Sequence, residues 1–119
     1  MFDFEKLDVY EKIRGLNRDL LPWIFRNQNQ HAYLCDQLKR SSLSSMLNLA
    51  EGTGRMGAQD KKQFYIRARA SVFESVAILQ IFLDLKIMSE TEYTVFYEQF
   101  ESISKMILGM IRNLHSDNQ

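Results

Sequence analysis

Apolar residues recur at helical spacing in four stretches of the chain, with polar residues between them. The stretches cover residues 5–24, 32–51, 59–86 and 90–114. Apolar side chains three or four positions apart share one face of an α-helix, so each stretch predicts a helix. One proline and five glycines are too few for an all-β fold. Short connections make successive helices antiparallel, which predicts an all-α, up-down-up-down four-helix bundle forming a single domain over residues 1–119.

Several short sequences predict where the helices end. Pro22 lacks a backbone N–H and disfavours helical geometry at the residue before it, so we expect the first helix to end or kink there. A polar connection should follow at 26–30, and three apolar residues should cover the end of the bundle: Trp23, Ile24 and Phe25. Ser89 followed by Glu92 is a capping box that opens the fourth helix. The polar residues 115–119 are expected to form a disordered tail.

The second stretch is rich in small residues. It holds four serines within five positions: Ser41, Ser42, Ser44 and Ser45. Serine is a poor helix former, and small side chains let helices approach closely, so we interpret the serines as a tight helix crossing. A polar binding surface is the alternative. Gly52 follows the last periodic residues, where a left-handed helix cap is expected. The Gly-x-Gly sequence at 52–54 is not predicted to bind phosphate, because a helix C-terminus carries the negative end of the dipole.

Almost every residue from 76 to 85 is apolar. A helix that is apolar all round is buried on several sides, whereas an outer helix of so small a bundle keeps one face in water. The excess therefore predicts an interface between subunits of a homo-oligomer. We assign three residues to this interface: Ile78, Ile81 and Leu85.

Basic residues gather in one third of the chain, although the formal net charge is zero. Residues 39–69 hold seven Lys or Arg and two Asp or Glu, whereas the rest holds eight and thirteen. Several cations lie near the predicted start of the third helix, where free N–H groups and the helix dipole also attract anions. This predicts binding of nucleic acid, RNA or DNA, on a patch that symmetric copies would repeat. The candidate nucleic-acid-binding residues are Lys39, Arg55, Lys61, Lys62, Arg67 and Arg69, with Tyr65 placed to stack beside the last two.

Arg40, Glu51, Arg69 and Glu74 have a second interpretation. They lie beside inward-facing positions of the second and third helices, where opposite charges predict an interhelical ion-pair or hydrogen-bond network that fixes register. Alternatively, the arginines share a phosphate-binding face. Intramolecular partners for the arginines would favour the structural interpretation.

Catalytic chemistry is poorly represented. The two histidines, His31 and His115, have no metal-ligand spacing with other residues, and Cys35 has no nearby candidate base. Neither a nucleophile elbow nor a dinucleotide fingerprint occurs. We therefore predict no enzymatic activity, no metal, no cofactor and no small-molecule substrate. A single cysteine, the absence of a long apolar run and an acidic start without a signal peptide predict a cytoplasmic location without membrane contact.

A family resemblance is carried by five parts of the chain. They are the opening Leu-Asp-Val-Tyr-Glu-Lys at 7–12 and residues 37–41, 48–55, 64–66 and 70–74. The chain resembles the four-helix-bundle proteins encoded in intervening sequences of bacterial 23S ribosomal RNA genes. The resemblance covers residues 4–114, and its most specific part is Asn-x-Ala-Glu-Gly-x-Gly-Arg. Residues that match the family motif are Arg40, Asn48, Glu51, Gly52, Arg55, Ser71 and Glu74.

The resemblance implies an antiparallel four-helix bundle that assembles as a homopentamer. It also implies kinship with the accessory variability determinants of diversity-generating retroelements, which look like basic pentameric barrels that bind nucleic acid and a reverse transcriptase. This chain departs from the pattern in being neutral. It also carries Ser44, Ser45 and Leu47 where members commonly have a proline and isoleucines.

Two functional hypotheses follow. The first is a non-enzymatic, homo-oligomeric accessory protein that binds RNA or an RNA–protein complex through a basic surface. The second is a structural or protein-interaction module that binds a protein such as a reverse transcriptase without touching nucleic acid.

Overall fold

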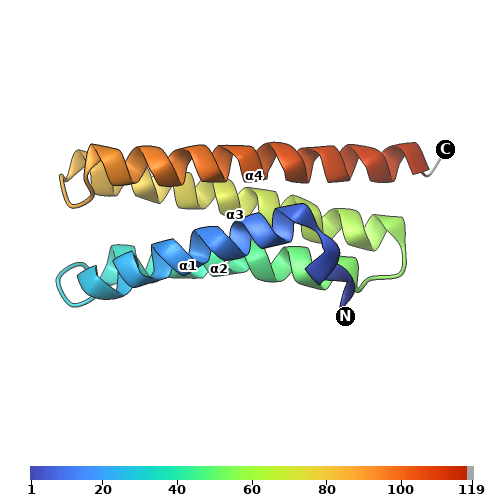
Figure 1. Ribbon diagram of the computed structural model, residues 1–119, viewed down its shortest axis with the longest axis horizontal. Helices are drawn as coiled ribbons and strands as arrows, with labels where there is room; N and C mark the ends of the chain where they lie inside the picture. Colours follow the sequence, from blue (N-terminus) through green and yellow to red (C-terminus); the bar gives the residue numbers. More distant parts are fainter. Residues whose placement is uncertain (118–119) are drawn as a thin grey trace.

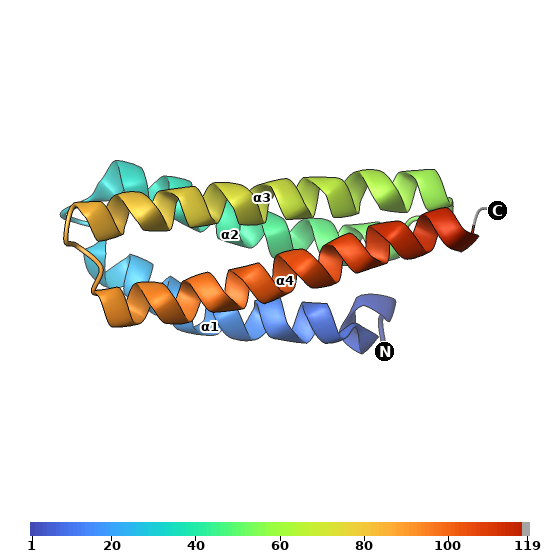
Figure 2. The same ribbon diagram turned by 90° about the horizontal axis from the view of Figure 1, so that it is seen from above.

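A computed structural model shows a bundle of four long α-helices (Figures 1 and 2). It describes residues 1–117, with side chains to residue 114. A 3₁₀ helix η1 (Asp3–Lys6) precedes α1 (Asp8–Asn27), α2 (Ala32–Thr53), α3 (Ala58–Asp84) and α4 (Glu90–Asp117). Successive helices run antiparallel, so both ends of the described chain lie at one end of the bundle. The predicted up-down-up-down four-helix bundle is confirmed, and the described residues contain no strand.

Helix α1 does not stop at Pro22. It continues through the proline to Asn27, whose Nδ2 donates to the carbonyl of Trp23 at 2.8 Å. The proline is tolerated because it is exposed, as is Arg18 one turn earlier, so the carbonyl without its helical partner faces water. Trp23 is buried as expected, but Phe25 is 59% exposed and does not cover the end of the bundle.

The other helix ends are close to the prediction. The Ser89–Glu92 capping box is confirmed, since the Glu92 N–H donates to Ser89 Oγ at 3.1 Å and the Ser89 N–H to Glu92 Oε1 at 3.2 Å. Helix α4 runs to Asp117, so residues 115–117 are helical and the disordered tail predicted there is wrong. Residues 118 and 119 of that tail lie outside the described residues.

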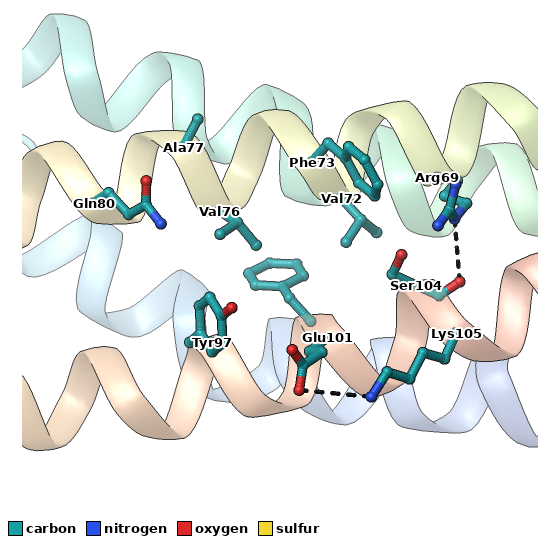
Figure 3. Close-up of a pocket in the computed structure, with 11 residues that line it drawn as sticks. Arg69, Val72, Phe73, Val76, Ala77, Gln80, Tyr97, Glu101, Ser104 and Lys105 are labelled. Atoms are coloured by element: carbon teal, nitrogen blue, oxygen red, sulfur yellow. Dashed lines mark hydrogen bonds and ion pairs between the residues drawn. The ribbon is translucent and has the colours of Figure 1, made fainter.

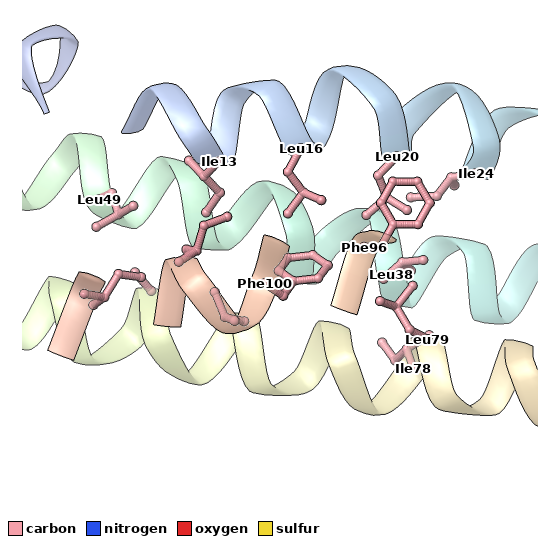
Figure 4. Close-up of a cluster of buried hydrophobic side chains, with 14 of the residues drawn as sticks. Ile13, Leu16, Leu20, Ile24, Leu38, Leu49, Ile78, Leu79, Phe96 and Phe100 are labelled. Atoms are coloured by element: carbon pink, nitrogen blue, oxygen red, sulfur yellow. The ribbon is translucent and has the colours of Figure 1, made fainter. Parts of the chain in front are cut away.

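The core runs along the bundle axis and receives side chains from all four helices. Figure 4 shows α1 residues pointing toward Phe96 and Phe100 of α4. Trp23 meets Phe82 of α3 edge-on, with ring centroids 5.0 Å apart. Ile78 also belongs to this core at 8% exposure, so its assignment to a subunit interface is wrong. Ile81 and Leu85 remain exposed at 43% and 58%.

The serines lie at the contact between α2 and α3. Ser41 and Ser75 Oγ atoms are 2.7 Å apart, and Ser71 Oγ donates to Ser44 Oγ at 3.0 Å. Ser75 Oγ also bonds the carbonyl of Ser71 at 2.9 Å. Small side chains thus bring the two helices together while their hydroxyls satisfy one another, which supports the tight crossing over a polar binding surface.

Gly52 lies inside α2 and does not cap it. The helix continues to Thr53, and the one positive φ among the described residues outside glycine belongs to Lys86, while no glycine has one. A Cβ on Gly52 would lie 2.7 Å from Tyr65 Cε1 and 3.0 Å from Phe64 Cβ. The predicted left-handed cap is therefore wrong, because this glycine instead lets α3 approach α2.

Candidate nucleic-acid interface at the joint of α2 and α3

The joint between α2 and α3 is held by residues of the Asn-x-Ala-Glu-Gly-x-Gly-Arg sequence. Asn48 Nδ2 donates to the carbonyl of Ser44 at 2.9 Å, and Arg55 Nη2 meets Glu51 Oε1 at 2.9 Å. Across the connection, Lys61 Nζ donates to the carbonyl of Thr53 at 2.9 Å and so satisfies the C-terminus of α2. The bond from Lys61 and the close approach at Gly52 fix where the first turn of α3 lies, whereas the bonds of Asn48 and Arg55 stay within residues 44–55.

Two arginines converge on Phe64 at this joint. The guanidinium carbon of Arg55 lies 4.5 Å from the centroid of the Phe64 ring, and that of Arg67 lies 5.0 Å from it. Arg67 is exposed and takes part in no ion pair with another described residue. The pair of Arg55 with Glu51 is itself open to water, with side-chain exposures of 42% and 56%, and therefore contributes little stability. The half-buried ring thus contacts two exposed cations.

The remaining candidate cations are divided among other places. Lys39 pairs with Asp36 at 3.5 Å, about four helical turns before the end of α2. Lys61 is engaged at the joint, and Lys62, half-buried beside it, also has an interaction. The structure thus brings Arg55, Lys61, Lys62 and Arg67 together and leaves Lys39 apart.

Arg69 faces α4 instead of the joint. Its Nε donates to the carbonyl of Ser104 at 3.4 Å, as Figure 3 shows, and its guanidinium carbon lies 4.8 Å from the Phe73 ring centroid. Tyr65 is only 5% exposed, so the expectation that it stacks at the surface is wrong. Phe64 takes the place that the sequence assigned to Tyr65.

The predicted ion-pair network between α2 and α3 is not formed. Arg40 and Glu74 are exposed, and neither has a hydrogen bond or ion pair to the rest of the described chain. The four ion pairs found there join residues three or four apart, such as Glu51 with Arg55. Register between the helices comes from the serine hydroxyls, and one of these serines, Ser71, matches the family motif.

A groove of about 410 Å³ separates α3 from α4 (Figure 3). Its floor is apolar, with Val72, Val76 and Phe100, and Arg69 lies at one end. A smaller hollow of about 240 Å³ continues past Arg69 and Phe73. No group of three or more His, Cys, Asp or Glu side chains in the described chain could hold a metal ion. None of its helices has the length and apolarity to cross a lipid bilayer.

Fold and joint together define a class: four-helix-bundle proteins with an Asn-x-Ala-Glu-Gly-x-Gly-Arg sequence where the second helix meets the third. The chain belongs to the 23S rRNA-intervening sequence protein family, whose profile matches residues 5–109. This match confirms the resemblance found in the sequence. A comparison with curated proteins found no match.

Proposed function

We propose that this chain is a non-enzymatic, homo-oligomeric accessory protein that binds nucleic acid, with RNA or an RNA–protein complex as its partner. The observation that carries the proposal is the convergence of Arg55 and Arg67, both exposed, on the half-buried ring of Phe64. A planar guanidinium offers several N–H donors that fit the oxygens of a phosphate. Stacking on a fixed ring limits the rotamers of both side chains, so less entropy is lost when phosphate binds.

The surroundings of the cluster suit a phosphate backbone. The N-terminus of α3 begins at Ala58, just before Phe64, and contributes the positive end of its dipole. Among the described residues, Glu51 is the one carboxylate paired with the cluster, and its solvent-exposed pair with Arg55 is weak enough for a phosphate to replace it. One cluster per chain gives weak binding, and repetition by symmetry would add phosphate contacts.

A salt titration of binding to single-stranded RNA tests this proposal. The variant Arg55→Gln/Arg67→Gln removes two charges from the cluster, and Arg14→Gln/Arg18→Gln removes two from exposed positions on α1 as a matched control. Each lost phosphate contact lowers the slope of log K against log salt by about 0.7 for a single strand. We expect a fall of about 1.4 for the cluster variant and none for the control. No binding at low salt, or equal slopes for both variants, would sink the mechanism.

The alternative is an interaction module whose partner is a protein such as a reverse transcriptase. The apolar groove between α3 and α4 favours it, because grooves of this kind accept helices of other proteins. The arginines divide: Arg69 is held by α4, whereas Arg40 and Arg67 have no ion pair within the described chain. This alternative predicts that Val76→Glu abolishes binding of the protein partner. It also predicts that Arg55→Gln/Arg67→Gln leaves that binding intact.

A further inference from the structure

A separate hollow lies beside the joint, where η1 packs against α2 (Figure 1). It has a volume of about 440 Å³. Phe2 and Phe4 line it together with residues at the end of α2, among them Ala50 and Thr53. Arg55 lines the same hollow and also contacts the Phe64 ring, so the hollow borders the arginine cluster.

Phe2 offers this hollow an aromatic ring that is held in place and yet open to water. Its side chain is 71% exposed. The ring stacks on that of Phe4, with centroids 5.7 Å apart and 11° between the planes, and Phe4 lies 4.8 Å from Tyr10. The Phe2 N–H donates to Glu5 Oε1 at 2.9 Å, which fixes the backbone. An ordered, exposed ring can stack on the flat face of a nucleic-acid base.

The polar groups of the hollow favour a ligand with hydrogen-bond donors and no charge. Carboxylates of Asp3 and Glu51 line it, with side chains 75% and 56% exposed, and the end of α2 adds the negative end of its dipole. The N–H groups of Gly54 and Arg55 already donate to carbonyls of α2, so they hold no anion. A phosphate is therefore repelled here, whereas a cationic side chain would meet Arg55 in the same lining.

We propose that this hollow binds a base of single-stranded RNA, guanine in preference to uracil, with Phe2 stacked on the base. Its neighbouring phosphate lies on the arginine cluster, so binding of the base rests on the proposed function. Sequence-specific proteins read unpaired RNA bases by stacking and by bonds to the Watson–Crick edge. Guanine presents two adjacent N–H donors on that edge, which match the two oxygens of a carboxylate. Uracil presents one donor between two carbonyls.

The ion pair of Glu51 with Arg55 connects the two halves of this site. In the free protein the two charges neutralise each other at 2.9 Å. A phosphate that takes Arg55 leaves Glu51 without its partner, as an anion beside another anion. The donors of guanine then pair with Glu51, so phosphate and base together replace one ion pair. Uracil leaves the carboxylate unpaired, and an unpaired charge discriminates against the wrong ligand.

Fluorescence anisotropy with two labelled RNA decamers tests this pocket. One decamer is oligouridine, and the other carries guanine at every third position. The wild type should bind the guanine-containing decamer at least tenfold more tightly, as a bidentate contact to a base allows. Phe2→Ala should weaken that binding about tenfold through lost stacking. Phe25→Ala removes a comparably exposed ring from α1, at 59%, and should change neither decamer.

Glu51→Gln separates base recognition from a merely structural role. It should remove most of the preference for guanine, because the amide offers one acceptor where the carboxylate offers two. It should also tighten binding of oligouridine, since Arg55 no longer has a competing carboxylate. A variant that weakens both decamers equally would contradict the role of Glu51.

The outcomes distinguish the base pocket from the phosphate cluster. Equal affinity of the wild type for the two decamers, with a normal salt slope, would overturn the pocket and leave phosphate binding standing. Phe2→Ala indistinguishable from Phe25→Ala would do the same. The absence of binding to either decamer at low salt would overturn both proposals. Binding of oligolysine that depends on Phe2 and Glu51, without a preference for guanine, would instead assign the hollow to a basic segment of a protein.

Discussion

Gly52→Ala should destabilise the protein, although alanine is the better helix former. The added Cβ would lie 2.7 Å from Tyr65 Cε1, whereas ordinary contacts lie at 3.4–4 Å. Tyr65 is buried and cannot swing away, so the helices must separate. Overpacking of this kind costs about 1–3 kcal/mol. Replacing glycine inside a helix returns about 1 kcal/mol, so the expected net loss is about 0–2 kcal/mol.

Urea denaturation at fixed protein concentration measures the effect, because an associating chain changes its apparent stability with concentration. Gly15→Ala on α1 is the matched control, since its Cβ would meet no atom within 4 Å. It should stabilise the protein by about 0.5–1 kcal/mol. The same Gly52→Ala change in a Tyr65→Leu background should lose part of its penalty, because leucine lacks the ε carbon, while the contact with Phe64 Cβ at 3.0 Å remains. Equal effects at Gly52 and Gly15 would refute the close-approach argument.

Three further predictions concern buried groups. Burial, and then the neighbouring Asp36 carboxylate, raises the pKa of the Cys35 thiol, so a thiol reagent should react with it only as the protein unfolds, at a rate set by denaturant. Ser75→Ala removes the bond to Ser41 and should lower the free energy of unfolding by about 1–2 kcal/mol, with Ser44→Ala, at the edge of the same contact, costing less. Burial raises the pKa of the Tyr65 phenol above its ordinary 10.0, so the folded state favours the neutral form and loses stability as pH rises past that value. Tyr65→Phe should therefore gain stability relative to wild type between about pH 8 and pH 11, as denaturation at each pH would measure.

The bundle itself was predictable because its signals are local. Helical spacing of apolar residues and the Ser89–Glu92 box depend on neighbours three or four positions away, and the structure confirms both. Errors at helix ends arose where the effect of a residue on the helix depends on whether that residue is exposed to water. Pro22 is tolerated because its turn faces water, which the sequence around it does not state.

The sequence does not indicate which side of a helix faces the core where apolar residues surround the helix. From 76 to 85 almost every position is apolar, so no period indicates which side faces the core. The sequence therefore predicts Ile78 at an outer interface, whereas its side chain is buried in the core. An error of the same kind, in the rotation of the helix about its axis, places Arg40 and Glu74 near the core in the sequence prediction. Both side chains are exposed in the structure.

Contacts across the joint were equally hidden, since they join residues from different helices. A side chain at position 52 would collide with Tyr65, thirteen positions later. No pattern in the sequence around Gly52 indicates this contact. Only part of the arginine cluster can be predicted from the sequence. Arg67 follows Phe64 by three positions and so shares its helix face, but Arg55 reaches the ring across the connection.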